Sequence, residues 1–228
     1  MQTFKTFLVH FGLVLTSSRL ITANKPIFIF NLTSDMKPTD FDNPQSALGK
    51  EVKFVVKGQH HKASEYLTLT PSKDVIELGI KITNTSIFVP GDDAKNTQYG
   101  FRRTDVLPAL DATTAYVGTT IFHQSVRLDP SLPLNLTHGY LLSSIELHDG
   151  THIYDLFTGS DFSADLKPVP TKGSGLLRVR NRKTKDIYHT NFKKNTVYNF
   201  AIEVNWDKST LTVYASENDK ELKKVAGP

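Results

Sequence analysis

The chain has 228 residues, of which 39% are hydrophobic and 22% charged, and a net charge of +4. This length suits one domain with a well-buried core, and the composition is ordinary for a globular protein. The absence of cysteine excludes disulfides, zinc–thiolate sites and cysteine nucleophiles. The small net charge does not indicate a nucleic-acid-binding protein, which concentrates many basic groups on one face.

Residues 1–23 have the pattern of a secretory signal peptide. Lys5 is the charged leader, residues 7–15 form a short apolar run, and Ile21-Thr22-Ala23 is the expected cleavage site. The alternative interpretation is a buried N-terminal strand or helix. The run is too short to span a bilayer, and no later segment is long enough. We therefore expect a secreted, extracellular protein without a membrane span.

Three Asn-X-Ser/Thr triplets agree with secretion. They begin at Asn31, Asn84 and Asn135, and each is an acceptor sequence for N-glycosylation. Such triplets arise often by chance, so they carry weight only together.

Short runs rich in β-branched and aromatic residues alternate with turn signals along the rest of the chain. Many short strands at this spacing, with few helical patterns, are typical of an antiparallel β-sandwich or barrel. No internal repeat or long linker is visible, so we expect a single domain over residues 24–228. The clearest predicted strands are 52–56, 75–82, 119–128, 140–147, 176–180, 197–204 and 211–215.

Alternation within a strand assigns its side chains to two faces of a sheet. In residues 119–128, Phe122 and Val126 share one face, whereas His123 and Arg127 share the other. The second face lacks the Lys/Glu mixture of a plainly solvated surface, which is the alternative interpretation. The pattern therefore favours a ligand groove.

Residues 98–105, Gln-Tyr-Gly-Phe-Arg-Arg-Thr-Asp, combine aromatic rings, arginines and a carboxylate in one strand-like run. Aromatic rings stack on sugars, guanidinium groups donate hydrogen bonds to hydroxyls, and a carboxylate can transfer protons. Alternation places Phe101, Arg103 and Asp105 on one face. This segment predicts a surface that binds carbohydrate.

Other patterns favour structural roles. His148 and His152 flank an Asp-Gly turn signal instead of lying on a helix with a third ligand, so we predict no metal site. The basic run 178–185 is interpreted as a hairpin with a charged tip that discourages edge pairing, with binding of an anionic polymer as the alternative. Trp206, beside an Asn/Asp turn, either packs under that turn or forms a sugar platform.

Several short motifs strengthen the carbohydrate interpretation by occurring together and in one order. They are Ser86–Gly91 followed by Tyr99–Arg103, then His123–Arg127, Pro133–His138, Asn199–Ala201 and Thr212–Ser216. In this order they resemble the secreted fungal glycoside hydrolase family 131, from about Pro26 to the C-terminus. The resemblance implies an all-β, antiparallel β-sandwich of the jelly-roll type. It also implies a glucan-binding cleft and hydrolysis of β-1,3, β-1,6 or β-1,4 linkages in cell-wall glucan.

The resemblance also implies site residues. Asp105 is the expected catalytic carboxylate, and Tyr99 is a possible stacking platform. The other expected substrate contacts are Arg102, Arg103, His123, Arg127, His138, Tyr140 and Tyr198. We expect no cofactor, and we expect a monomer that binds β-glucan polysaccharide or oligosaccharide.

This chain departs from the family at three of these positions. The family's first glutamate is replaced by Asp105, its second by Gly139, and the histidine before Asn-Phe-Ala by Tyr198. Hydrolysis of a glycoside usually needs two carboxyl groups. Glu146 lies seven residues after Gly139, about 23 Å along a continuous strand and thus too far from that position.

Three functions remain open. The first is a glucan-recognising protein with impaired or lost hydrolysis, and the second is an active β-glucanase that uses Asp105 with a partner such as Glu203. The third is a protein-interaction module on the same fold, because a fold does not by itself fix a function. The family continues past Lys224-Val225-Ala226 into another strand, so we expect that the C-terminus could be truncated.

Overall fold

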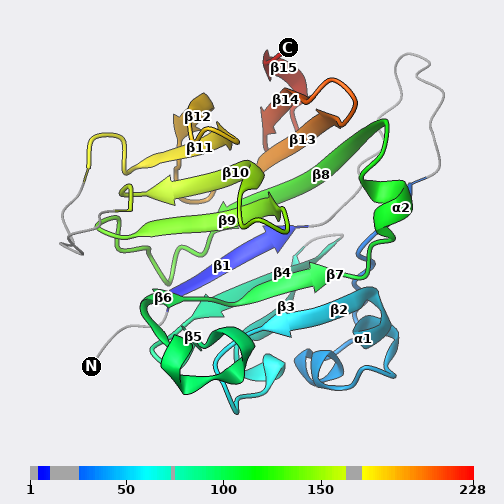
Figure 1. The fold of residues 1–228 in the computed structure, drawn as a ribbon, viewed down its shortest axis with the longest axis vertical. Coiled ribbons are helices and arrows are strands. Elements are labelled where there is room, and N and C mark those ends of the chain that lie inside the picture. The colour runs from blue at the N-terminus through cyan, green and yellow to red at the C-terminus, as the bar shows by residue number, and fades with distance from the viewer. Residues whose placement is uncertain (1–4, 11–25, 73–74, 163–170) are drawn as a thin grey trace.

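The structure is a computed structural model that describes residues 5–10, 26–72, 75–162 and 171–228. It consists almost entirely of antiparallel strands (Figure 1). The strands of the largest sheet are β1 (Lys5–His10), β3 (Leu67–Ser72), β4 (Val75–Ile82), β8 (Thr119–Leu128), β13 (Tyr198–Asn205), β14 (Thr210–Glu217) and β15 (Lys223–Ala226). They form a seven-stranded sheet in the order β15-β14-β13-β8-β1-β4-β3.

Two smaller sheets lie in front of the seven-stranded sheet in Figure 1 and together form what we call the front layer. One has four strands in the order β12-β11-β10-β9, and the other pairs β2 with β7. Their bounds are β2 (Val52–Val56), β7 (Asp105–Pro108), β9 (Gly139–Glu146), β10 (His152–Gly159), β11 (Leu176–Asn181) and β12 (Asp186–Asn191). A short hairpin of β5 (Ile87–Phe88) and β6 (Gln98–Arg102) precedes β7.

Helical segments are few and short. The α-helices are α1 (Ala47–Glu51) and α2 (Ala112–Ala115). The 3-10 turns are η1 (Pro38–Asp42), η2 (Ala63–Glu65), η3 (Pro90–Asp92) and η4 (Ala94–Asn96). Among the described residues, no helix has the length and apolar character needed to cross a membrane.

Two hydrophobic cores hold the front layer against the seven-stranded sheet. In the first, Leu156 and Val179 of the front layer meet Val126, Phe200 and other buried side chains of the large sheet. In the second, Val55 and Val106 of β2 and β7 pack with Leu67, Leu78 and the aromatic rings of Phe30 and Phe41. Burial of apolar area on this scale is the main force that stabilises a sandwich.

The predicted all-β sandwich is confirmed. The predicted strands 52–56, 75–82 and 119–128 coincide with β2, β4 and β8. The predicted faces of β8 are also observed, because Val126 is 2% exposed whereas His123 is exposed and Arg127 is partly exposed. The alternation of side chains with a period of two predicts both the strands and the faces of their side chains.

Strand β1 lies inside the segment predicted to be a signal peptide. Its backbone pairs with β4 on one side and with β8 on the other, so these residues form a strand, as in the alternative interpretation. Residues 11–25, which contain the predicted cleavage site, lie outside the described residues, so the signal peptide stays a prediction. Its removal would leave β4 and β8 without the strand between them.

Candidate functional site

Arg103 joins two carboxylates from different parts of the chain. Its Nε and Nη2 atoms donate to Asp105 Oδ2 at 2.9 and 2.5 Å, and Nη2 lies 3.6 Å from Glu146 Oε2. The guanidinium group lies over the ring of Phe88, 4.5 Å from its centroid. Because Asp105 begins β7 and Glu146 ends β9, this group links the two sheets of the front layer.

Both carboxylates face the outer surface of the front layer. Val106 packs in the second core and Ile145 against the first, so alternation turns Asp105 and Glu146 outward. Their side chains are 38% and 49% exposed. Solvent and a ligand can therefore reach both groups.

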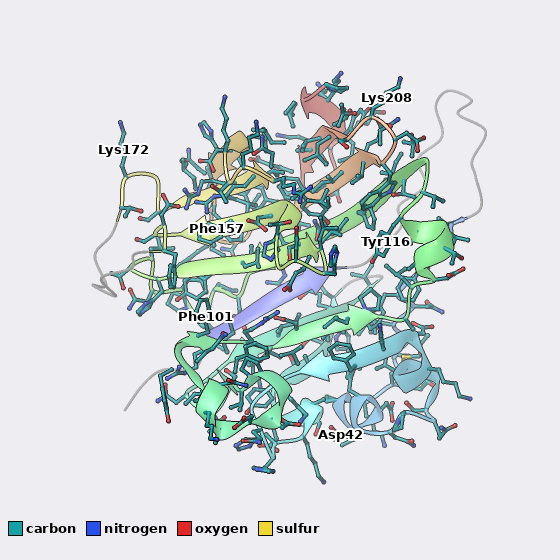
Figure 2. All side chains as sticks on the ribbon, in the orientation of Figure 1. Asp42, Phe101, Tyr116, Phe157, Lys172 and Lys208 are labelled. Carbon is teal, nitrogen blue, oxygen red and sulfur yellow. The ribbon has the colours of Figure 1, made fainter. Side chains whose placement is uncertain are left out.

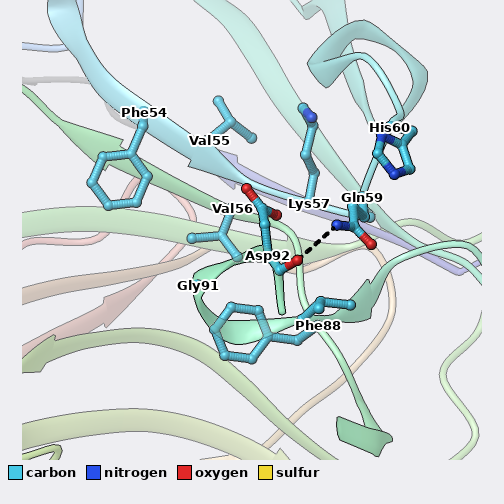
Figure 3. Close-up of a pocket in the computed structure, with 11 residues that line it drawn as sticks. Phe54, Val55, Val56, Lys57, Gln59, His60, Phe88, Gly91 and Asp92 are labelled. Atoms are coloured by element: carbon cyan, nitrogen blue, oxygen red, sulfur yellow. Dashed lines mark hydrogen bonds between the residues drawn. The ribbon is translucent and has the colours of Figure 1, made fainter. Parts of the chain in front are cut away.

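A pocket of about 480 Å³ (Figure 3) is lined by two residues that neighbour Arg103 and Asp105. Val56 in its wall lies directly opposite Asp105 in the register of β2 and β7, and Phe88 is the ring beneath Arg103. The lining residues are Phe54, Val55, Val56, Lys57, Gly58, Gln59, His60, Phe88, Val89, Gly91 and Asp92. Apolar rings with a few polar groups are the usual composition of a small-molecule site.

A histidine–aspartate pair lies beside Glu146. His152 is directly across from Glu146 in the register of β9 and β10, and its Nδ1 atom lies 2.5 Å from Asp155 Oδ1. Directly opposed side chains in an antiparallel pair have Cβ atoms about 4.5–5.5 Å apart. An oriented imidazole is therefore close to the end of β9.

Exposed aromatic side chains continue from this group along β6. Phe101 and Phe162 stack with ring centroids 5.3 Å apart and an interplanar angle of 17°, and they remain 44% and 66% exposed. Tyr99 is 75% exposed. Figure 2 shows Phe101 at the β6 end of the front layer, below Phe157 of β10. Arg102 donates to the carbonyl oxygens of Tyr99 and Phe101 at 2.7 and 3.2 Å, so it braces this segment.

The backbone at Gly139, where the sequence predicts the loss of a family acid, leaves no room for a side chain. A Cβ atom on Gly139 would lie 2.6 Å from the Ser160 carbonyl oxygen and 2.7 Å from Phe157 Cζ. The guanidinium carbon of Arg180 lies 3.9 Å from the centroid of the Phe157 ring and that of Arg178 lies 5.0 Å from it. Glycine is thus the residue that fits beside Phe157.

Asp161 neutralises the two arginines around Phe157. It accepts hydrogen bonds from Arg178, at 3.0 Å, and from Arg180. Burial acts to raise the pKa of Asp161, but the two arginines outweigh it and lower the pKa. The basic run predicted as a hairpin therefore forms internal ion pairs at its base, while Arg182 near the tip lies 3.3 Å from Asp149.

His123 and Arg127 lie on the opposite side of the sandwich from Asp105. Val126 packs in the first core, so its neighbours in β8 face the outer surface of the seven-stranded sheet. Desolvation lowers the pKa of His123 although its side chain is exposed. Arg127 Nε donates to Glu77 Oε1 at 2.7 Å, and this pair raises the pKa of Arg127. The structure therefore does not gather all expected contacts into one cleft.

Tyr140 and Tyr198 are buried between the sheets. The Tyr140 hydroxyl donates to the Asn135 carbonyl at 3.1 Å, and burial raises its pKa to about 12. The Tyr198 hydroxyl donates to the Asn191 carbonyl at 2.6 Å. Both side chains secure loops instead of lining a surface. His138 is exposed, and its carbonyl oxygen accepts from Ser160 N at 3.1 Å.

The remaining motifs have structural surroundings. Trp206 packs edge-on against Tyr116, with centroids 5.3 Å apart, and donates to Thr120 Oγ1 at 2.8 Å. No group of three or more potential metal-ligating side chains occurs within the part of the chain that the structure describes. The predicted glycosylation sites Asn31, Asn84 and Asn135 are all exposed.

The chain is thus an antiparallel β-sandwich whose front layer carries two carboxylates that contact one arginine. The family model of the glycoside hydrolase 131 catalytic N-terminal domain matches residues 31–228. The chain therefore belongs to glycoside hydrolase family 131.

Solved structures share the fold. One is a family 131 β-glucanase catalytic domain from Podospora anserina, with a TM-score of 0.64 and 19% identity over 85% of this chain and 75% of that chain. Another is the catalytic domain of a family 131 protein from Coprinopsis cinerea, with a TM-score of 0.60 and 20% identity over the same shares. No curated protein matches the chain significantly.

Proposed function

We propose that this chain is a secreted protein that recognises β-glucan of cell walls and in which hydrolysis is impaired or lost. The observation that supports impaired or lost hydrolysis is the lack of space for a side chain at Gly139. Phe157 and the Ser160 carbonyl occupy the space that a side chain would need, so the family's second acid is not merely deleted. Loss of one of two catalytic groups typically lowers the rate by orders of magnitude.

The proposed recognition of β-glucan rests on the exposed surface around Arg103. Arg103 follows β6, which carries the exposed rings of Tyr99 and Phe101, and Phe162 stacks on Phe101. This part of the surface therefore offers a guanidinium donor and flat apolar faces. Sugars present apolar ring faces and rows of hydroxyl groups. Stacking on aromatic rings and donation from a guanidinium group match both features.

Calorimetric titration of aromatic variants tests glucan recognition. Wild-type protein is titrated with laminarin, pustulan and cello-oligosaccharides, followed by Phe101→Ala and Phe162→Ala. Each loss of an aromatic contact is expected to weaken binding about threefold to tenfold. The matched control is Ile121→Ala, because Ile121 is 48% exposed but lies on β8 in the other layer. Equal affinities for all four proteins would exclude this surface from glucan binding.

An active β-glucanase is the second candidate, and the proximity of Asp105 to Glu146 favours it. Sugar release that disappears in Asp105→Asn would support this function, and activity that survives the substitution would exclude Asp105 from the chemistry. A protein-interaction module is the third candidate. It predicts no affinity for any of the glucans and a protein partner in a pull-down.

A further inference from the structure

The pocket in Figure 3 has an apolar side and a polar side. Phe54 and Val56 lie on one side of the view, and Lys57 and His60 lie on the other. The volume of about 480 Å³ lies within the range of about 300–1,000 Å³ that is usual for small-molecule sites. Phe54 is 48% exposed, and His60 is exposed as well. A ligand from solvent can therefore reach both kinds of lining group.

The two chain segments that form the pocket are tied to the fold and to each other. A Cβ atom on Gly58 would overlap the Thr85 carbonyl oxygen, so residues 57–60 pack closely against that part of the chain. Gln59 Nε2 donates to the Asp92 carbonyl oxygen at 3.3 Å, which joins this segment to the turn after β5. A site that is formed in advance loses less conformational entropy when a ligand binds.

Two lining residues adopt a backbone conformation that favours glycine. His60 has a φ angle of 64° and Asp92 has a φ angle of 55°, and both side chains belong to the pocket. Left-handed backbone at residues other than glycine is uncommon and is concentrated at ligand sites and active sites. An imidazole and a carboxylate are thus kept at positions where the backbone alone would favour glycine.

The charged lining groups suit a neutral ligand that carries hydroxyl groups. Lys57 offers only hydrogen-bond donors, whereas the Asp92 carboxylate offers only acceptors. A hydroxyl group can accept from the lysine and donate to the aspartate. An anion would lie near the Asp92 carboxylate and a cation near the Lys57 ammonium group, so neither is favoured. The ring of Phe54 adds an apolar surface, which matches the face of a sugar ring.

The pocket continues into the surface around Arg103. Phe88 lines the pocket, and the Arg103 guanidinium carbon lies 4.5 Å from the centroid of the Phe88 ring. Phe88 of β5 pairs with Gln98 of β6, the strand that carries the exposed ring of Phe101. The pocket and the exposed rings therefore share one hairpin, and a chain of several sugars can extend from one to the other.

We propose that this pocket binds one sugar unit of a β-glucan chain whose neighbouring units lie over the rings of β6. The inference rests on the proposed function and adds a second contact region to it. The rings of Phe54 and Phe88 contact the apolar face of the sugar, while Lys57, His60 and Asp92 form hydrogen bonds with its hydroxyl groups. Long oligosaccharides that fill both regions therefore bind more tightly than short ones that fill only one.

Calorimetric titration with oligosaccharides of increasing length, from the laminari, gentio and cello series, tests the pocket. Lys57→Met removes the ammonium group and keeps an apolar stem. For the longest oligosaccharides it is expected to weaken binding about threefold to tenfold and to reduce the gain in affinity with length. The matched control is Lys53→Met, which changes an exposed lysine of β2 outside the lining and is expected to leave the affinity unchanged.

His60→Gly separates ligand binding from folding. The substitution removes the imidazole but places glycine at a left-handed position, so Tm is expected to stay the same or to rise. The affinity for the longest oligosaccharides is nevertheless expected to fall about threefold. A purely structural role of His60 would not produce this combination.

Two results would overturn the pocket as a sugar site and leave glucan recognition standing. One is equal affinity of Lys57→Met and Lys53→Met for every oligosaccharide that the wild-type protein binds. The other is unchanged affinity of His60→Gly while Phe101→Ala binds more weakly than wild type. If the wild-type protein binds neither the oligosaccharides nor the polymers, the proposed function itself fails, and the sugar site fails with it.

Discussion

Gly139→Ala is expected to lower the free energy of unfolding by about 1–3 kcal/mol, the usual cost of overpacking. The added Cβ atom would lie 2.6 Å from the Ser160 carbonyl oxygen and 2.7 Å from Phe157 Cζ. The oxygen belongs to the backbone, so its relief requires β9 and the end of β10 to separate. The Phe157 ring can turn aside only by leaving its contact with Arg180.

Thermal unfolding followed by circular dichroism measures this cost. For a domain of this size, 1 kcal/mol shifts Tm by about 2–4 °C, so the expected decrease is about 2–12 °C. Gly175→Ala is the matched control, because no atom lies within 4 Å of its added Cβ. Its free energy of unfolding is expected to stay within about 0.5 kcal/mol of wild type or to rise slightly.

Placing a glutamate at position 139 tests whether the space around Gly139 can hold a longer side chain. Gly139→Glu is expected to be destabilised and to release no more sugar from β-glucan than wild type. Phe157→Ala removes the ring that obstructs a side chain at position 139 and leaves only the Ser160 carbonyl oxygen. The double variant Gly139→Glu/Phe157→Ala is therefore expected to be more stable than the sum of the two single changes predicts. If Gly139→Ala matches its control and Gly139→Glu gains hydrolysis, the reasoning about the closed position is refuted.

Further predictions concern the other side of the sandwich, the N-terminus and acid stability. Arg127→Ala removes the guanidinium group that pairs with the 2%-exposed Glu77, so urea unfolding is expected to show a loss of about 1.5–3 kcal/mol. The affinity for glucan is expected to stay unchanged because the pair lies on the far face, and weaker binding would contradict that placement. A chain of residues 24–228 lacks β1 and is expected to have a lower unfolding midpoint than the full chain, whereas equal midpoints would show that β1 adds nothing. Because the folded-state pKa of Asp161 is lowered from 3.8, its stabilising contribution is complete above that pH and is lost as the pH falls through the folded-state pKa. The difference in Tm between wild type and Asp161→Asn is therefore expected to shrink below about pH 4, and a constant difference would contradict the ion pairs.

The strands could be predicted from the sequence because each carries its own period. The run Val52–Val56 and the run Thr119–Leu128 were predicted with the bounds that the structure shows. Strand β10 (His152–Gly159) is absent from the predicted strands, although the Asp149-Gly150 turn that precedes it is a known hairpin signal. In the structure, Gly150 N donates to the Leu147 carbonyl at 2.9 Å in that turn.

The site was only partly predictable, because its geometry depends on how strands meet. Alternation placed Phe101, Arg103 and Asp105 on one face, but it did not reveal that His123 belongs to the far side of the sandwich. The spacing of Glu146 from Gly139 along one strand does not predict its proximity to Asp105. Its relation to Asp105 runs across two sheets through Arg103, and no pattern within one strand contains that information.

The proposal that this chain recognises β-glucan is tested most directly by calorimetric titration of the wild-type protein with laminarin, pustulan and cello-oligosaccharides. We predict saturable binding to at least one of them. The absence of binding to all three would contradict glucan recognition, whatever the fold.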